Sequence, residues 1–284
     1  MPYYRLPIVT CFVFCCISLN SFSQQLFREP LGIQAYTFRR SLPFNTAATL
    51  DTIRSMGIRL LEGGAPRGMT PEAFRKLCEE KGIRIPSTGA SYEELVNRTD
   101  SVVYKARALG ASYVMCSWIP HSRGAFSLAD AQKAVADFNR AGQRLQENGL
   151  TLCYHVHGYE FQPYGNGTLL DYLVMQTNPD YVSFEMDILW VQFGGGDPVT
   201  LLNRYGNRWK LMHLKDLRKG VAKDLTGGTS QENDMALGTG ELDIPGILKA
   251  AKKAGIRYYF IEDESSAILT QVPQTIRYLK SLKK

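Results

Sequence analysis

The chain has 284 residues and a formal net charge of +6, from 33 Lys and Arg residues against 27 Asp and Glu residues. The basic residues are spread along the sequence and cluster only in the C-terminal KSLKK, so the basic stripe of a nucleic-acid-binding protein is missing. Beyond the first 16 residues the cysteines are Cys78, Cys116 and Cys153, an odd and scattered set that argues against a disulfide framework.

The first 23 residues have the layout of a secretory signal peptide. Arg5 precedes an apolar run from Leu6 to Leu19, and the small residues of SFS follow before Gln24. The run is short and interrupted compared with the roughly 20 apolar residues of a transmembrane helix. A lipoprotein anchor is disfavoured, because FVFCC lacks the small residues that usually precede the lipidated cysteine. We therefore expect cleavage after Ser23, export to the periplasm, no membrane span in the mature form, and one domain over residues 24–284.

Similar sequence motifs recur along the rest of the chain, each with a glycine that would end a helix followed by a short apolar run. They are MGIRLLE from Met56, KGIRIPS from Lys81, LGASYVM from Leu109, NGLTLCY from Asn148 and AGIRYYF from Ala254. Such runs are typical of buried parallel strands. With three further candidates, we predict strands near residues 31–36, 58–62, 83–88, 112–117, 150–155, 181–186, 209–214 and 256–262.

Eight alternating strand–helix units in this length predict an α/β fold, a (β/α)8 TIM barrel. The alternative is an open doubly wound sheet. It is less well supported, because no glycine-rich turn with the dinucleotide-binding spacing follows the first predicted strand.

Polar side chains gather at the predicted C-terminal ends of the strands, where such a barrel places its active site. They are Glu62, Ser117, Trp118, His155, His157, Glu160, Glu185, Asp187, His213, Lys215, Asp216, Glu262 and Glu264. Imidazole and carboxylate groups from different strands can hold one divalent ion, and this mixture of donors suits Mn²⁺, Zn²⁺, Co²⁺ or Fe²⁺. Taken singly, each residue could equally be a salt-bridge partner, a loop cap or a core histidine. Their convergence on several strand ends favours the metal site.

The motifs LGIQAYTFR, YHVHGYEF, FEMDILW, HLKD and ALGTGELDIPGILKAAKKAGIRYYFIEDE occur in this order. They resemble those of the sugar phosphate isomerase/epimerase family of xylose isomerase-like barrels, over nearly all of the chain after the leader. The family's Tyr-His-Asn-His reads Tyr-His-Val-His here, with Val156 in place of the asparagine. The resemblance implies one metal ligand from each of the last four strands: His155 or Glu160, then Asp187, His213 and Glu262.

With a metal held there, we expect removal of the proton α to a carbonyl, through an enediolate, with Glu160, Glu262 or His155 moving the proton. Substrate contacts are expected from His157, Lys215, Glu185, Asp216, Trp118 and Glu62. Returning the proton would give isomerisation or epimerisation, and expelling a leaving group would give a lyase or hydratase. Because sugar phosphates are mainly cytosolic, export favours a free sugar, a keto-sugar or a 3-keto-glycoside as the carbohydrate substrate.

Three other functions remain open at the level of sequence. A sugar-binding barrel could keep the fold without catalysis. An endonuclease with a trinuclear zinc centre needs more histidines than the four present. A glycoside hydrolase would use two carboxylates and no metal. A homo-oligomer is compatible with the sequence.

Overall fold

The computed structural model describes Met1, Tyr3 and residues 25–283. In it, eight parallel strands close into a barrel in the order β1-β12-β9-β8-β5-β4-β3-β2, which confirms the predicted fold. The strands are β1 (Leu31–Gln34), β2 (Leu60–Glu62), β3 (Arg84–Gly89), β4 (Tyr113–Cys116), β5 (Thr151–His155), β8 (Val182–Asp187), β9 (Trp209–Leu214) and β12 (Tyr258–Ile261). Each overlaps one of the predicted ranges. Apart from Met1 and Tyr3, the expected signal peptide lies outside the described residues.

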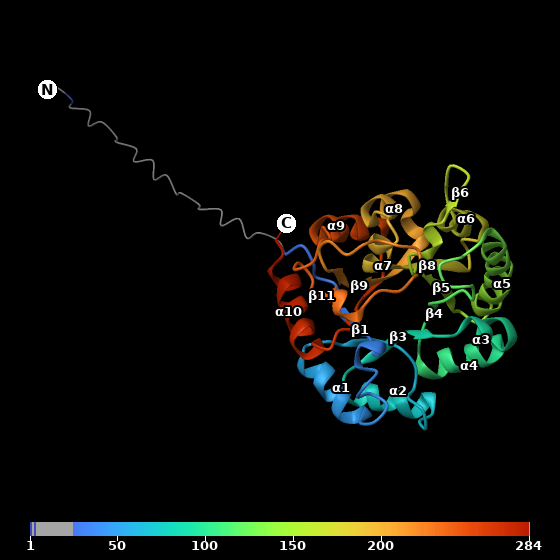
Figure 1. The fold of residues 1–284 in the computed structure, drawn as a ribbon. Helices are drawn as coiled ribbons and strands as arrows, with labels where there is room; N and C mark the ends of the chain where they lie inside the picture. Colours follow the sequence, from blue (N-terminus) through green and yellow to red (C-terminus); the bar gives the residue numbers. More distant parts are fainter. Residues whose placement is uncertain (2, 4–24, 284) are drawn as a thin grey trace.

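Helices surround the strands, as Figure 1 shows. They are α1 (Thr46–Ser55), α2 (Pro71–Glu80), α3 (Tyr92–Asn97), α4 (Thr99–Leu109), α5 (Leu128–Gln146), α6 (Leu169–Gln176), α7 (Ile188–Phe193), α8 (Pro198–Tyr205), α9 (Ile244–Ala254) and α10 (Ile268–Ser281). Side-chain caps fix several of their starts: Ser91 and Ser127 form capping boxes on α3 and α5, and Thr70 caps α2 ahead of its first-turn proline. In the part of the chain that the structure describes, no helix combines the length and apolar character needed to cross a bilayer.

The barrel interior contains an apolar layer directly beneath the polar residues of the strand ends. Leu60, Cys153, Leu211 and Phe260 pack together from four strands in this layer. The Phe260 ring leaves no room for a side chain on β1, because a Cβ on Gly32 would lie 2.4 Å from it. Since strand side chains alternate between faces, the next inward positions are two residues further along each strand. Those positions are Glu62, His155, His213 and Glu262.

Two short hairpins were not anticipated from the sequence. The strands β10 (Asp216–Leu217) and β11 (Asp234–Met235) pair antiparallel and join the two ends of the loop that follows β9. The strands β6 (Pro163–Tyr164) and β7 (Gly167–Thr168) pair ahead of α6. The first hairpin brings residues 227–231 and Asp234 to the mouth of the barrel, where they line a cavity.

Candidate metal and substrate site

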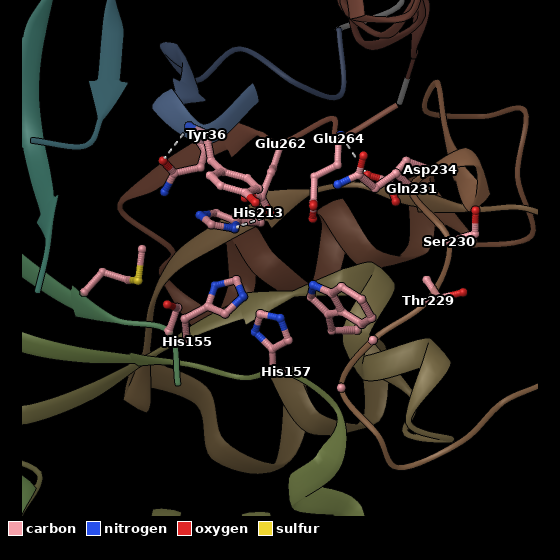
Figure 2. Close-up of a pocket in the computed structure, with 16 residues that line it drawn as sticks. Tyr36, His155, His157, His213, Thr229, Ser230, Gln231, Asp234, Glu262 and Glu264 are labelled. Carbon is pink, nitrogen blue, oxygen red and sulfur yellow. Dashed lines mark hydrogen bonds and ion pairs between the residues drawn. The ribbon is translucent and has the colours of Figure 1, made fainter. Parts of the chain in front are cut away.

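A cavity of about 440 Å³ opens at the carboxyl ends of the barrel strands. Its described lining comprises Gln34, Tyr36, Met115, Ser117, His155, His157, Trp190, His213, Gly227, Gly228, Thr229, Ser230, Gln231, Asp234, Glu262 and Glu264. Figure 2 shows the imidazoles and carboxylates of this set pointing into a common space. The strand ends therefore meet as the barrel fold requires.

Four donor atoms converge on this cavity from the neighbouring strands β5, β8, β9 and β12. The Nδ1 atom of His213 lies 3.3 Å from Oε2 of Glu262 and 3.7 Å from Oδ2 of Asp187. The Nε2 atom of His155 lies 4.0 Å from the same Asp187 oxygen. Donors at these separations can share one ion about 2.0–2.2 Å from each of them.

Buried carboxylates orient both imidazoles from behind. Nε2 of His213 lies 2.6 Å from Oε2 of Glu62, and Nδ1 of His155 lies 3.2 Å from Oε2 of Glu185. Each ring thus directs its other nitrogen toward Asp187. This carboxylate–imidazole pairing is common behind metal-binding histidines.

The unsatisfied atoms of the site provide a test of whether a metal fits. Asp187 uses Oδ1 to accept a hydrogen bond from the Trp190 backbone N–H at 3.0 Å, at the start of α7. Its Oδ2 atom and Nδ1 of His213 are buried and have no hydrogen-bond partner among the described residues. Unpaired buried polar atoms are costly. Two of them facing each other, with a carboxylate and an imidazole beside them, match the needs of a divalent ion.

His155, Glu185 and His213 form a second group with ligand atoms close enough to share an ion. Glu185 does not line the cavity, and its oxygens face the two imidazoles. Asp187, His213 and Glu262 form the other group, in which Nδ1 of His213 and Oδ2 of Asp187 face each other without a hydrogen-bond partner among the described residues. We therefore place the candidate metal position at Asp187, His213 and Glu262, with Nε2 of His155, 4.0 Å from Asp187, as a further donor beside it.

Burial and nearby charges shift the pKa values of these histidines in different directions. Burial holds the pKa of His155 well below its usual value and lowers the pKa of His157 to about 3, so both rings are neutral near pH 7. Burial opposes the charge on His213 too, but Glu185 and Glu262 outweigh it and raise the pKa of that ring well above its usual value. Burial, with Glu62 close by, raises the pKa of Glu185 to about 8. Neutral imidazole is the form that binds metals, so an ion bound at His213 would replace the proton on that ring.

Lys215 lies beneath the cavity rather than in its lining. Its fully buried Nζ lies 2.5 Å from Glu264, 3.3 Å from Glu262 and 3.4 Å from Asp234, and 5.2 Å from the centre of the Trp190 ring. Although burial alone would lower its pKa, Glu262 and Asp234 raise that pKa well above its usual value. Lys215 orients these carboxylates, so the predicted direct contact with substrate does not fit its placement.

Glu160 is not brought to the metal position. Gly158 has a positive φ of 89°, and the short helix after it (Tyr159–Phe161) turns Glu160 back behind β5. There the carboxylate accepts hydrogen bonds from the Tyr154 hydroxyl and from the His157 backbone N–H at 3.0 Å. Neither its assignment as a strand-five ligand in place of His155 nor its assignment as a base fits this position.

Of the other predicted substrate contacts, His157 lines the cavity, with a buried Nδ1 that has no hydrogen-bond partner among the described residues. Glu62 and Glu185 instead contact the imidazoles of His213 and His155. Asp216 accepts four backbone N–H groups, at residues 217, 238, 240 and 242, and so holds the loop. Trp118 packs on the Tyr159 ring beside the cavity without lining it. Glu62, Glu185 and Asp216 lie outside the lining for one reason, because their carboxylates already contact other groups of the protein.

Several lining residues were not predicted from the sequence. Gln34 is the last residue of β1 and Tyr36 follows it, and the strand-end rule applied to that strand would have found them. Trp190 comes from α7, which begins directly after Asp187. Gln231 and Asp234 reach the cavity only because β10 and β11 pair, and no local pattern signals that pairing.

Residues 50–282 match the model of the family described as xylose isomerase-like TIM barrel. Inosose dehydratase of Lacticaseibacillus casei is 25% identical over 237 residues, covering 72% of this chain and 77% of that protein. A sugar phosphate isomerase/epimerase from Parabacteroides distasonis is 25% identical, with a TM-score of 0.73 over 93% of this chain and 96% of that one. An IolI protein solved with a bound zinc atom is 14% identical, with a TM-score of 0.68 over 88% and 95% of the two chains, and it supports the fold alone.

Proposed function

This chain belongs to the xylose isomerase-like TIM barrel family and is an enzyme of that family, and from this premise we propose that it removes the proton α to a carbonyl of a small carbohydrate with the help of a divalent metal. One observation carries the proposal. Nδ1 of His213 and Oδ2 of Asp187 face each other, buried and without a hydrogen-bond partner in the described part of the chain, and His213 lines the cavity together with Glu262 and His155.

His155, Asp187, His213 and Glu262 would hold the ion. When bound, a divalent metal supplies Lewis-acid polarisation of a substrate carbonyl. The donor set of two imidazoles and two carboxylates is compatible with Zn²⁺, Mn²⁺, Co²⁺ or Fe²⁺. The zinc in the IolI protein makes Zn²⁺ the first ion to test.

Glu264 is the carboxylate placed to take the proton. It lines the cavity with 18% of its side chain exposed, and the contact with Lys215 fixes its position. His157 lines the same cavity and has an unpaired Nδ1 with which to bind a substrate hydroxyl. A positioned carboxylate that faces a bound carbonyl compound is the arrangement that general base catalysis requires.

The substrate is an unphosphorylated sugar, keto-sugar or keto-glycoside. None of the described residues that line the cavity is Lys or Arg, whereas Asp234, Glu262 and Glu264 all line it. Three carboxylates disfavour a phosphate ester by charge repulsion. The signal-peptide-like leader supports the same choice, since we also propose that the mature protein is exported.

Two outcomes share this first step. Return of the proton from Glu264 gives isomerisation or epimerisation, as in the isomerase/epimerase relative. Loss of a β leaving group gives a lyase or dehydratase, and the similarity to inosose dehydratases favours this second candidate. Both require the same enolisation.

The test begins with the metal content of the purified mature protein, measured by mass spectrometry for the wild type and for Asp187→Ala and His213→Ala. We expect about one transition-metal ion per wild-type chain and a loss in both variants. The metal-loaded protein is then incubated in D₂O with keto-sugars and 3-keto-glycosides, and deuterium uptake α to the carbonyl is followed by NMR. Metal binding without uptake across the panel would instead support a sugar-binding barrel.

A further inference from the structure

A second cavity, of about 340 Å³, adjoins the candidate site. Gln34, Tyr36 and Met115 line both cavities, so the two spaces meet at these side chains. The second cavity extends toward the segments that follow β1, β2 and β3. Its volume falls in the range of ligand sites, about 300–1,000 Å³.

The two cavities differ in chemistry. The first contains imidazoles and carboxylates, whereas the second is bounded by Ala35, Leu42, Pro43 and Pro66 together with bare glycine backbone. A ligand that spans both spaces would therefore have a polar part over the metal ligands and an apolar part beyond Tyr36.

The one charged side chain in the described lining of the second cavity is Arg39, and its guanidinium is already engaged. It donates to the Glu264 backbone oxygen at 2.8 Å and to the Tyr36 backbone oxygen at 3.1 Å. Its central carbon lies 4.6 Å from the centre of the Tyr36 ring. These contacts hold the guanidinium against backbone oxygens and the Tyr36 ring, and the rest of the described lining is uncharged.

Glycine backbone leaves room for a ring. Apart from its chain neighbours, no atom of the described residues would lie within 4 Å of a Cβ added to Gly89, and a Cβ added to Gly64 would lie 3.7 Å from the Thr88 hydroxyl. Ser87 and Gly89 occupy the same face of β3, so a side chain at residue 89 would project toward the barrel mouth. The Tyr36 ring is half-exposed beside this space and can stack on a planar group.

We propose that this second cavity binds an apolar, ring-containing aglycone, so that the substrate is a glycoside whose sugar ring occupies the metal-side cavity. This inference rests on the proposed function, because the sugar ring must sit over the metal ligands. Of the sugars, keto-sugars and keto-glycosides in the proposed function, it selects the keto-glycosides, and it assigns aglycone recognition to the segments at the ends of β1, β2 and β3.

The test compares phenyl and methyl 3-keto-glucosides, in both anomeric forms, on the metal-loaded protein. We expect the wild type to bind the preferred phenyl glycoside about 10-fold or more tightly than the methyl glycoside, by calorimetry, because burial of the ring adds apolar contact. Gly89→Leu should abolish this preference and leave methyl glycoside binding unchanged. Gly89→Ser, which adds much less volume, is the matched control and should retain most of it.

The outcomes separate the two proposals. Equal wild-type binding of phenyl and methyl glycosides, with deuterium uptake from both, would overturn the aglycone subsite and leave the proposed function standing. Absence of binding and uptake for every glycoside, with uptake from a free keto-sugar, would overturn this inference alone. Absence of uptake from the free keto-sugars as well would overturn the proposed function with it. Because the wild-type comparison needs no variant, it decides the question even if Gly89→Leu fails to fold.

Discussion

The Glu62 carboxylate lies 2.6 Å from Nε2 of His213, on the side of the ring away from the metal position. Glu62 also accepts hydrogen bonds from Gln34 at 2.9 Å and from Ser87 at 2.5 Å, and it is fully buried. The carboxylate is therefore held rigidly by three strands. Glu62 thus sets the orientation of the His213 imidazole, and both side chains are buried away from solvent.

We expect Glu62→Gln to weaken metal binding 10- to 100-fold without removing a ligand, because the His213 ring loses a charged partner that fixes its orientation. Metal affinity, measured by competition with a chelator, checks this. Glu79→Gln is the control, since Glu79 pairs with Arg75 on the surface and is half-exposed. Unchanged affinity in Glu62→Gln would show that other contacts orient the ring.

Glu264→Gln should separate metal binding from proton transfer. The substitution keeps the size of the side chain and leaves the metal ligands in place, so we expect normal metal content and a fall of about 10²–10⁴-fold in deuterium uptake. Glu262→Gln is the comparison and should lose metal and uptake together. If Glu264→Gln exchanges deuterium at the wild-type rate, another group is the base.

Lys215→Met should destabilise the protein by about 3–5 kcal/mol, because three carboxylates would remain beneath the cavity without their buried cation. Urea unfolding of the metal-depleted protein at pH 8 measures this loss. Lys105→Met removes a half-exposed lysine from its ion pair with Glu94, and such pairs contribute less than about 1 kcal/mol. Similar losses in the two variants would argue against a structural role for Lys215.

Glu160 should make stability depend on pH. Burial raises its pKa to about 7 in the folded protein, against 4.5 as the ordinary value. The folded state therefore binds the proton more tightly, and its stabilising effect is complete below about pH 4.5 and lost as pH rises through 7. The size of the change is roughly 3 kcal/mol. Glu160→Gln cannot titrate, so its unfolding free energy should fall less between pH 5 and 8 than that of the wild type. Parallel pH profiles would contradict the assignment.

Metal removal should lower the melting temperature. A ligand present at 100 times its Kd stabilises the folded state by about 2.7 kcal/mol, and each kcal/mol shifts the melting temperature of a chain of this size by roughly 2–4 °C. We expect a fall of about 5–10 °C on chelation of the wild type, reversed by added metal. His213→Ala should show no shift, since it lacks a ligand.

The strand positions and the inward placement of the proposed metal donors could be predicted from the sequence because both follow from local rules. Strand alternation places His155 and Asp187 inward at the ends of β5 and β8, whatever the loops do. The position of Glu160 behind β5 could not be predicted, because a single positive-φ glycine, Gly158, reverses the chain after His157. The place of Asp234 in the cavity lining could not be predicted, because it depends on the pairing of two-residue strands far apart in the sequence. Burial of a polar group against other polar groups is a property of the assembled fold.

The donors on β5, β9 and β12 lie two residues beyond Cys153, Leu211 and Phe260, members of the apolar layer inside the barrel. A one-residue slip of any of these strands would carry its ligand to the helix side and expel a core residue in the same step. The packing of the core thus fixes where the proposed donors lie. The segments that follow the strands can change in length and composition without moving these donors. New substrates can be acquired by remodelling those segments, while selection for folding alone preserves the positions of the proposed metal donors.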